Sequence, residues 1–244
     1  MAPFYAKLHA VCGRFTLTVP GFDELCEALG LTAEPAATAL YQPRYNIAPS
    51  NLTWVLTTPH DDEPPQLSQS RWGYQGAGRA GRAKPLRNAR AELLGKAVPF
   101  ELALTQRRCI VVADGFLEWH SKDADRRPYW FRPSDHGLLL LAGVYAESEP
   151  VSSFAIVTCA ANADVQDLHP RMPRLLDRSE ASAWLEPGWA QLLTPPPAGR
   201  LHKTRVSQRV NAVRNDDPAC LFPEDGPAAG TNLELFASLA RSNS

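Results

Sequence analysis

Proline and glycine interrupt this chain so often that every apolar segment between them is short. The sequence has 22 prolines in 244 residues, which is about 9% against an average of about 5%. Proline ends or kinks helices because it lacks the backbone N–H and clashes with the preceding turn. We therefore expect short strands and loops with few helices, and we exclude an all-helical bundle.

The apolar segments themselves favour strands. Runs of β-branched and apolar residues, typical of strands, occur at 12–19, 52–58, 67–74, 109–113, 116–120, 129–131, 138–145 and 154–159. The acidic, proline-bearing turn between the second and third runs indicates a hairpin. Helical patterns are limited to three segments, at 22–29, 91–104 and 179–185. Gly30 follows the first of these at the position of a C-cap.

The order of these elements lacks the regular strand–helix alternation of a parallel sheet. We therefore predict an α+β fold, in which a curled antiparallel β-sheet forms a barrel-like core with a few short peripheral helices. A chain of 244 residues with 44% hydrophobic residues can build one domain with a sizeable core. The predicted organisation is an extension at 1–11, one domain at 12–224 and a polar C-terminal tail at 225–244.

The total charge excludes a protein that binds polyanions through its overall charge, since 25 basic residues nearly cancel 26 acidic ones. The charges are nevertheless segregated along the chain. Residues 71–96 carry seven basic side chains and one acid, Glu92, and residues 200–214 carry five basic side chains and no acid. Each run alone is explained by a solvated surface. The two runs together favour a groove for a nucleic-acid backbone, with an affinity that falls as salt rises.

Cysteine spacing and hydropathy bear on the cellular compartment. The five cysteines show neither the close pairs of a zinc or redox site nor a disulfide framework. No stretch approaches the roughly 18 apolar residues of a transmembrane helix, and the first residues lack the apolar core of a signal peptide. We expect a cytoplasmic protein with reduced thiols and no membrane contact.

Four short segments place a polar residue beside glycine, proline or an aromatic residue. They are Cys12-Gly13-Arg14-Phe15, Asn88-Ala89-Arg90-Ala91-Glu92, Gly115-Phe116-Leu117-Glu118-Trp119 and His169-Pro170-Arg171-Met172-Pro173. Each has a structural explanation when taken alone. A lone cysteine is usually a small buried hydrophobe, and Glu118 in a strand can point to solvent. Asn88 before a helical pattern is usually an N-cap, and His169 before a proline is usually a loop residue.

In this order the four segments resemble the SRAP family (SOS response-associated peptidase), whose members process abasic sites in DNA. The resemblance covers roughly residues 12–222 and includes Arg44-Tyr45-Asn46-Ile47-Ala48-Pro49, Trp72-Gly73, Val206-Ser207 and Val210-Asn211. It implies a DNA-repair protein that recognises abasic sites in single-stranded DNA and attaches to them covalently through Cys12. Schiff-base lyase and autoproteolytic activities are also implied. We expect a monomer that needs no metal and no organic cofactor.

An N-terminal cysteine suits this reaction because it is a 1,2-aminothiol. The open form of an abasic deoxyribose carries an aldehyde, with which a free α-amine condenses to a Schiff base. The α-amine is partly neutral at physiological pH because its pKa is about 7.7–8.0. The adjacent thiolate then adds to the imine carbon and closes a five-membered thiazolidine ring. An internal cysteine lacks the amine and gives only a reversible hemithioacetal.

This chain departs from the family before Cys12, where eleven residues stand and the family has only an initiator methionine. One explanation is a misplaced start, because a GTG codon encodes valine internally and methionine at a start, which would make Val11 the first residue. The other is autoproteolysis before Cys12. We favour the misplaced start, and either route would expose the aminothiol.

The resemblance assigns the remaining roles by position. Asn88 would orient the reacting amine or sugar, and Glu118 would exchange protons if burial raises its pKa. His169 would assist opening of the sugar ring as a general acid or base. DNA contacts are expected for Arg14, Asn46, Trp72, Arg90 and Arg171, with the arginines gripping phosphates through their planar fork. Trp72 and Trp119 have core packing as an alternative to base stacking.

Two other functions remain open at this point. A non-covalent single-stranded DNA-binding module would have the same fold and basic groove but a blocked Cys12. A cysteine peptidase acting on other proteins would require Cys12 and His169 to meet in a peptide-sized cleft, which their spacing does not show. Replacing Cys12 by alanine separates the first function from the second, because it would abolish covalent attachment and leave salt-sensitive binding intact.

Overall fold

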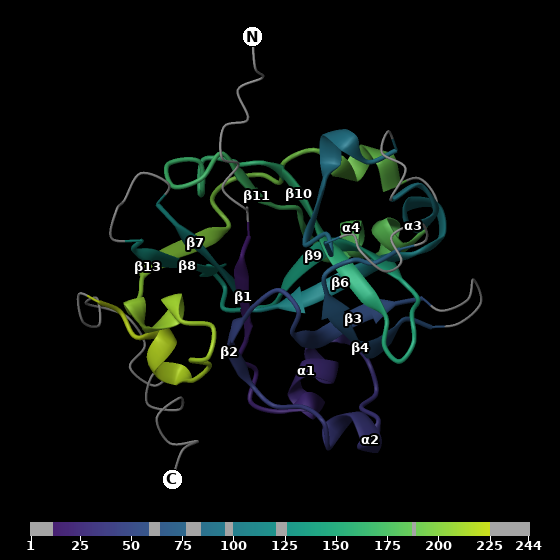
Figure 1. The fold of residues 1–244 in the computed structure, drawn as a ribbon, viewed down its shortest axis with the longest axis horizontal. Helices are drawn as coiled ribbons and strands as arrows, with labels where there is room; N and C mark the ends of the chain where they lie inside the picture. The colour runs from purple at the N-terminus through teal and green to yellow at the C-terminus, as the bar shows by residue number, and fades with distance from the viewer. Residues whose placement is uncertain are drawn as a thin grey trace.

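Two β-sheets with short helices around them make up the described part of the chain (Figure 1). The computed structural model describes residues 12–58, 64–76, 84–95, 100–120, 126–186 and 189–224. The expected extension at 1–11 and tail at 225–244 lie outside the described residues, as do Arg79, Arg82 and Lys96 of the first basic run.

The smaller sheet carries the segment that begins at Cys12. Its five strands lie in the order β13-β8-β7-β1-β2. They are β1 (Arg14–Leu17), β2 (Arg44–Ile47), β7 (Gly115–Trp119), β8 (Pro128–Pro133) and β13 (Leu201–Arg205). All its strand pairs are antiparallel. Arg14 lies opposite Leu117, so the residues just before Arg14 run alongside Glu118 and Trp119.

The larger sheet has eight strands and curls into a ring. Its order is β11-β10-β4-β3-β6-β9-β12, with β5 beside β10, and the ring closes because β10 also pairs with β9. The strands are β3 (Leu52–Thr57), β4 (Gln66–Trp72), β5 (Asn88–Arg90), β6 (Arg108–Ala113), β9 (Leu139–Ala146), β10 (Ser153–Ala160), β11 (Arg171–Pro173) and β12 (Leu175–Leu176). The predicted α+β class and curled core are confirmed. Unlike the expected antiparallel arrangement, β10 pairs in parallel with β4 and β5.

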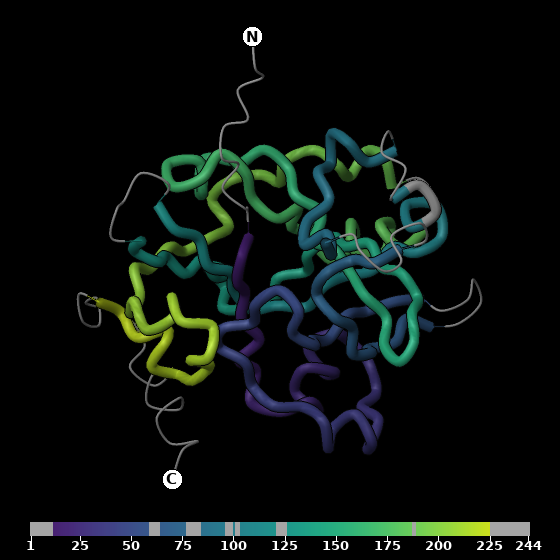
Figure 2. Tube along the Cα trace, viewed as in Figure 1, coloured from purple at the N-terminus to yellow at the C-terminus, as the bar shows by residue number. Residues whose placement is uncertain are grey.

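The described helices are short and peripheral, as the tube in Figure 2 makes clear. They are α1 (Phe22–Leu29), α2 (Pro35–Thr38), α3 (Glu101–Gln106) and α4 (Arg178–Leu185), with 3₁₀ turns η1 (Ala91–Leu93), η3 (Trp189–Leu193), η4 (Gln208–Asn211) and η5 (Pro218–Leu221). The predicted C-cap is confirmed, since Gly30 follows α1 with a left-handed φ of 73°. Among the described helices, none has the length and apolarity needed to cross a membrane.

Two hydrophobic clusters hold the sheets together. In the main cluster, Phe15 of β1 contacts Trp72 of β4 with ring centroids 5.1 Å apart. Trp72 in turn stacks on Phe154 of β10 at 6.4 Å. A smaller cluster, which includes Leu117 and Val210, packs the small sheet against the C-terminal 3₁₀ turns. The strand that follows Cys12 is therefore anchored to the ring by Phe15, while its partner strand β7 is anchored to the C-terminal segment.

Some short elements escape the sequence pattern. The segment 34–50 shows no sustained period in the sequence, yet it contains α2 and β2. Asn88, for which an N-cap was the structural alternative, lies in β5, and Arg90 precedes η1. The helical pattern predicted over 91–104 is divided between η1 and α3.

Candidate active site

Cys12 and Glu118 meet where the antiparallel pair β1–β7 ends. The backbone N–H of Cys12 donates a hydrogen bond to Glu118 Oε1 at 2.6 Å. Cys12 is fully buried and Glu118 is 2% exposed. The predicted pair of a nucleophile and a proton-exchanging carboxylate is thus placed in direct contact, with the carboxylate on the nitrogen of Cys12.

Burial governs the ionisation of both groups. Loss of solvent raises the pKa of Glu118 to about 8, although the N–H groups of Cys12 and Trp119 oppose the shift by hydrogen bonding to the carboxylate. The pKa of the Cys12 thiol is raised well above its usual range by burial and, secondarily, by the charge of Glu118. Near neutral pH the site therefore holds a thiol, and Glu118 is poised to gain or lose a proton.

The backbone at Cys12 is strained. Its φ of 47° falls in the left-handed region, which costs a residue with a Cβ about 1–2 kcal/mol. Asp114, in the turn between β6 and β7, supports the strand that follows. Its carboxylate accepts hydrogen bonds from the hydroxyls of Thr16 at 2.5 Å and Thr18 at 2.6 Å. These contacts fix β1 in register, and so hold Cys12 beside Glu118.

A cationic group flanks this pair. The guanidinium carbon of Arg14 lies 5.6 Å from the ring centroid of Trp119, within the range of a cation–π contact. Trp119 Nε1 donates to Asn211 Oδ1 at 2.6 Å, which fixes the ring. Arg14 Nε is buried and has no hydrogen-bond partner among the described residues. Burial and the charge of Arg126 lower the pKa of Arg14, yet arginine remains a cation.

The other predicted site residues gather around β10 of the ring. Parallel pairing sets Asn88 opposite Ile156 and Arg90 opposite Thr158, and Arg171 lies opposite Ala160 on the antiparallel neighbour β11. Asn88 and Arg90 are half-buried and share one face of β5, because the buried Ala89 between them points to the other face.

His169 precedes β11 and is 5% exposed. Its Nδ1 accepts a hydrogen bond from the backbone N–H of Arg171 at 3.1 Å. The ring is thereby held by its own turn. The group around β10 is joined to the first through the core, since Cys12, Ala89 and Met172 belong to one hydrophobic cluster.

Arg171 is engaged by an acidic residue that was not predicted to belong to the site. Both of its terminal nitrogens donate to the carboxylate of Glu92, at 2.9 and 3.0 Å. Glu92 ends the motif that contains Asn88 and Arg90, and it is the one acid in the first basic run. A single acid within a basic run was therefore the sequence feature that could have indicated an ion pair with one of the predicted arginines.

Asn46 and Trp72 have structural positions. The side-chain amide of Asn46 is fully buried and donates to the backbone carbonyls of Val210, Ala212 and Asn215. Trp72 is fully buried against Phe15 and Phe154, and its Nε1 donates to the carbonyl of Arg87 at 2.8 Å. In this structure both residues hold other segments in place and offer no exposed surface to a nucleic acid.

The second basic run is largely neutralised in space. Lys203, Arg205 and Arg209 form ion pairs with Asp167, Glu224 and Asp217 respectively. These acids lie outside residues 200–214, so the run lacks negative charge in the linear sequence but not in the folded structure. The groove expected from the two runs together would therefore receive a weaker contribution from 200–214.

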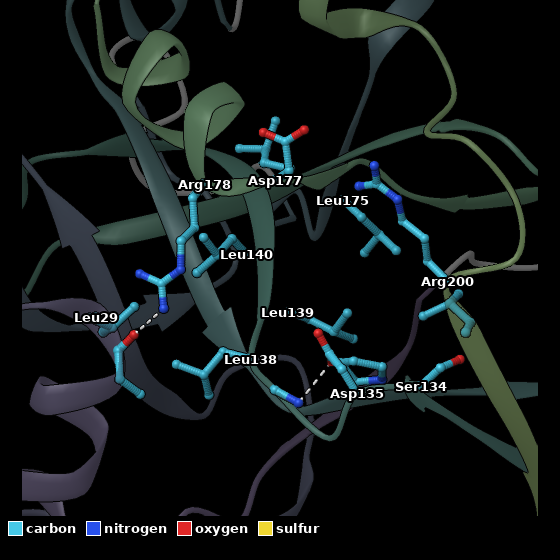
Figure 3. A pocket seen from close by; sticks show the side chains of 15 residues that line it. Leu29, Ser134, Asp135, Leu138, Leu139, Leu140, Leu175, Asp177, Arg178 and Arg200 are labelled. Atoms are coloured by element: carbon cyan, nitrogen blue, oxygen red, sulfur yellow. Dashed lines mark hydrogen bonds between the residues drawn. The ribbon is translucent and has the colours of Figure 1, made fainter.

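A cavity of about 510 Å³ lies apart from the predicted site residues (Figure 3). Its floor is leucine-rich, and Asp135, Asp177, Arg178 and Arg200 lie among its lining residues. Arg178 donates to the carbonyl of Ala28 at 2.6 Å across one side. None of the predicted site residues lines it. Within the described residues, His, Cys, Asp and Glu form no group of three or more that could hold a metal ion.

Comparison with known proteins gives consistent matches. Residues 11–213 match the family model described as SOS response associated peptidase (SRAP). The chain is 32% identical over 222 residues to abasic site processing protein YoqW of Bacillus subtilis (strain 168), covering 85% of this chain and 97% of that protein. It is 30% identical over 229 residues to abasic site processing protein YedK of Escherichia coli (strain K12), covering 87% and 100%.

Solved structures agree on the fold. A crystal structure of a Bacteroides thetaiotaomicron protein superposes with a TM-score of 0.73 at 19% identity, covering 86% of this chain and 98% of that chain. A phage-related protein of Bordetella bronchiseptica gives a TM-score of 0.64 at 26% identity, covering 81% and 95%. Because the family match extends over most of the described domain, the chain belongs to the SRAP family.

Proposed function

We propose that this protein processes abasic sites in single-stranded DNA and becomes covalently attached to them through Cys12 once that residue is N-terminal. The observation that carries the proposal is the 2.6 Å contact between the Cys12 nitrogen and Glu118 Oε1. A buried carboxylate on this nitrogen can move protons during attack on an aldehyde. The names of the relatives YoqW and YedK, both abasic site processing proteins, support the substrate class.

The proposed reaction has two bond-forming stages. The neutral α-amine of Cys12 attacks the C1′ aldehyde of the open sugar to give a carbinolamine, which loses water and becomes a Schiff base. The thiol sulfur then adds to the imine carbon, and its proton ends on the ring nitrogen. Glu118 takes a proton from the attacking amine and returns one to the departing hydroxyl, so it serves first as base and then as acid.

The flanking residues supply binding and orientation. Arg14 and Arg90 would attract the phosphates next to the lesion, and Asn88 would orient the reacting sugar through hydrogen bonds. His169 is proposed to protonate the ring oxygen as the sugar opens. Lyase activity follows if the Schiff base eliminates the 3′ phosphate before the ring closes.

Intact mass spectrometry tests the proposal. A chain that begins at Cys12 is incubated with a single-stranded oligonucleotide that carries one abasic site, and its mass is measured after denaturation. We expect the mass of protein plus oligonucleotide minus one water. A chain that keeps the residues before Cys12 should form no such adduct. Absence of an adduct from the chain that begins at Cys12 would overturn the covalent mechanism.

The alternative is a non-covalent single-stranded DNA-binding module. It is favoured by the amide form of the Cys12 nitrogen in the chain of 244 residues, where that N–H donates to Glu118. The variant Cys12→Ala distinguishes the two functions. It loses the adduct and keeps binding if the covalent function is correct, whereas it changes neither property of a module that never reacts.

A further inference from the structure

Glu92 occupies the guanidinium of Arg171 in the way that a phosphate would. The two hydrogen bonds, from Nη1 to Oε1 at 2.9 Å and from Nη2 to Oε2 at 3.0 Å, form the paired fork by which arginine grips carboxylates and phosphates alike. The side chain of Glu92 is 53% exposed, whereas that of Arg171 is 16% exposed. The carboxylate therefore lies on the solvent side of a largely buried cation.

The remaining donors of Arg171 are directed into the protein. Nη2 also donates to the carbonyl of Thr158 at 2.7 Å and to its hydroxyl at 3.2 Å. Nε is buried and has no hydrogen-bond partner among the described residues. The guanidinium is thus held in place by β10, and the fork that it presents outward is taken by Glu92. A DNA phosphate can use that fork only after the carboxylate moves away.

The charge of Glu92 is maintained by its neighbours. Its pKa is lowered by the hydrogen bond from Arg171, with smaller contributions from the charges of Arg171 and Arg90. Glu92 is therefore ionised at neutral pH and lies near both arginines of the group around β10. A fixed negative charge at this position repels the backbone of any strand that approaches.

We propose that Glu92 is a phosphate-mimicking carboxylate, which occupies Arg171 in the free protein and competes with the DNA backbone for it. The inference rests on the proposed function, because it takes the surface formed by Arg90 and Arg171 as part of the DNA-binding face. The competition keeps affinity for undamaged strands low. Because the carboxylate is half-exposed, solvent weakens the ion pair, so a strand held by other contacts, or by the reaction at Cys12, can displace Glu92.

Salt dependence of binding tests this competition. The probe is a single-stranded oligonucleotide without an abasic site, so that no covalent step contributes. In wild-type protein Arg171 is already compensated and adds little counterion release. In Glu92→Gln we expect binding about five- to tenfold tighter at low salt, and a plot of log affinity against log salt that is steeper by about 0.7, the value for one extra phosphate contact on a single strand.

A double-mutant cycle shows whether the gain passes through Arg171. Arg171→Gln alone should weaken binding, because it leaves the negative charge of Glu92 uncompensated beside the strand. In the Glu92→Gln background, the same replacement should remove most of the gain. The inference is overturned if Glu92→Gln binds as wild type or more weakly, or if its gain persists without Arg171.

The matched control is the ion pair of Glu147 with Arg107, in which Nη2 lies 2.7 Å from Oε2 and the side chains are 65% and 30% exposed. Ala146, the residue before Glu147, lies opposite Ser153 on β10. Ser153 is five residues from Thr158, or about 17 Å along the strand. Glu147→Gln should leave the salt slope unchanged.

Failure of the proposed function and failure of this inference give different results. If wild-type protein binds no single-stranded DNA at any salt concentration, the proposed function fails. If wild-type protein binds and Glu92→Gln binds equally well, only the inference about Glu92 fails.

Discussion

Glu118 Oε1 accepts a hydrogen bond from the backbone nitrogen of Cys12, although 106 positions separate the two residues. The contact exists because β1 and β7 pair antiparallel, with Arg14 opposite Leu117. Burial of the carboxylate then raises its pKa to about 8. Strand register and burial together place a carboxylate with a raised pKa against the nitrogen of Cys12.

The first prediction concerns Glu118→Gln. Glutamine keeps the size and hydrogen bonding of the side chain but cannot exchange protons, so the chain that begins at Cys12 should form its adduct with abasic DNA at least about 100-fold more slowly. The measurement is a time course of adduct on a denaturing gel. Glu147→Gln, a replacement of an exposed glutamate just after β9, serves as the control. An unchanged rate in Glu118→Gln would show that proton transfer uses another group.

The second prediction is a pH dependence of stability. In the 244-residue chain the pKa of Glu118 is about 8 when folded and about 4.3 when unfolded. Between these values the folded state binds a proton that the unfolded state lacks. The free energy of unfolding therefore falls as pH rises from about 4.3 to 8, by an amount on the order of 5 kcal/mol. Urea unfolding at several pH values measures this fall.

Two controls sharpen this second prediction. Glu118→Gln removes the titrating group, so its stability should vary less over the same pH range. In the chain that begins at Cys12, the cationic amine would contact the carboxylate and lower its pKa, so the fall in stability should move to lower pH. Equal pH profiles for wild type and Glu118→Gln would contradict the raised pKa.

The fold could be predicted wherever local pattern and pairing agree. The end of α1 could be predicted at Gly30, because glycine adopts a left-handed φ without steric cost and this preference depends on one residue alone. The antiparallel pairing of β3 with β4 follows from two apolar runs around one turn. β5 and β12 were missed because strands of three and two residues carry no readable alternation. Their strand conformation depends on pairing with β10 and β9.

The sequence allowed individual site residues to be named, but it did not allow their side-chain partners to be predicted. Cys12 and Glu118 were both named from their motifs, and the structure brings them together. The pairing of Arg171 with Glu92 was missed, because 79 positions separate the residues and side-chain pairing follows from the packing of β5 and β11 on β10. For the same reason the acid partners of Lys203 and Arg209 could not be inferred from charge runs.

The third prediction separates packing from DNA contact at Trp72. Trp72→Phe keeps an aromatic ring between Phe15 and Phe154 but loses the hydrogen bond to the Arg87 carbonyl. We expect a loss of about 1–3 kcal/mol in the free energy of unfolding, because the smaller ring leaves unfilled space in the core and the indole hydrogen bond is lost, although the Arg87 carbonyl still accepts from the backbone N–H of Ile156. Affinity for an intact single-stranded oligonucleotide, measured where both proteins are folded, should not change. Weaker binding with unchanged stability would instead assign Trp72 to base stacking.

The fourth prediction concerns Arg14, whose Nε has no hydrogen-bond partner among the described residues and whose guanidinium lies over Trp119. A cation held this way is available to a phosphate. Arg14→Gln should weaken binding to an intact oligonucleotide about tenfold at low salt, and reduce the salt slope by about 0.7. Fluorescence anisotropy across a salt series measures both quantities.

Arg132 provides a matched control for Arg14. It also lies 5.6 Å from a tryptophan ring centroid, that of Trp130, and its Nε is also buried without a hydrogen-bond partner among the described residues. Pro128 pairs with Trp119, and Arg132 lies four residues further along β8, about 13 Å away. Arg132→Gln should therefore leave the salt slope at its wild-type value. Equal losses of DNA affinity in the two variants would mean that Arg14 acts through net charge or packing, rather than through a phosphate contact beside Cys12.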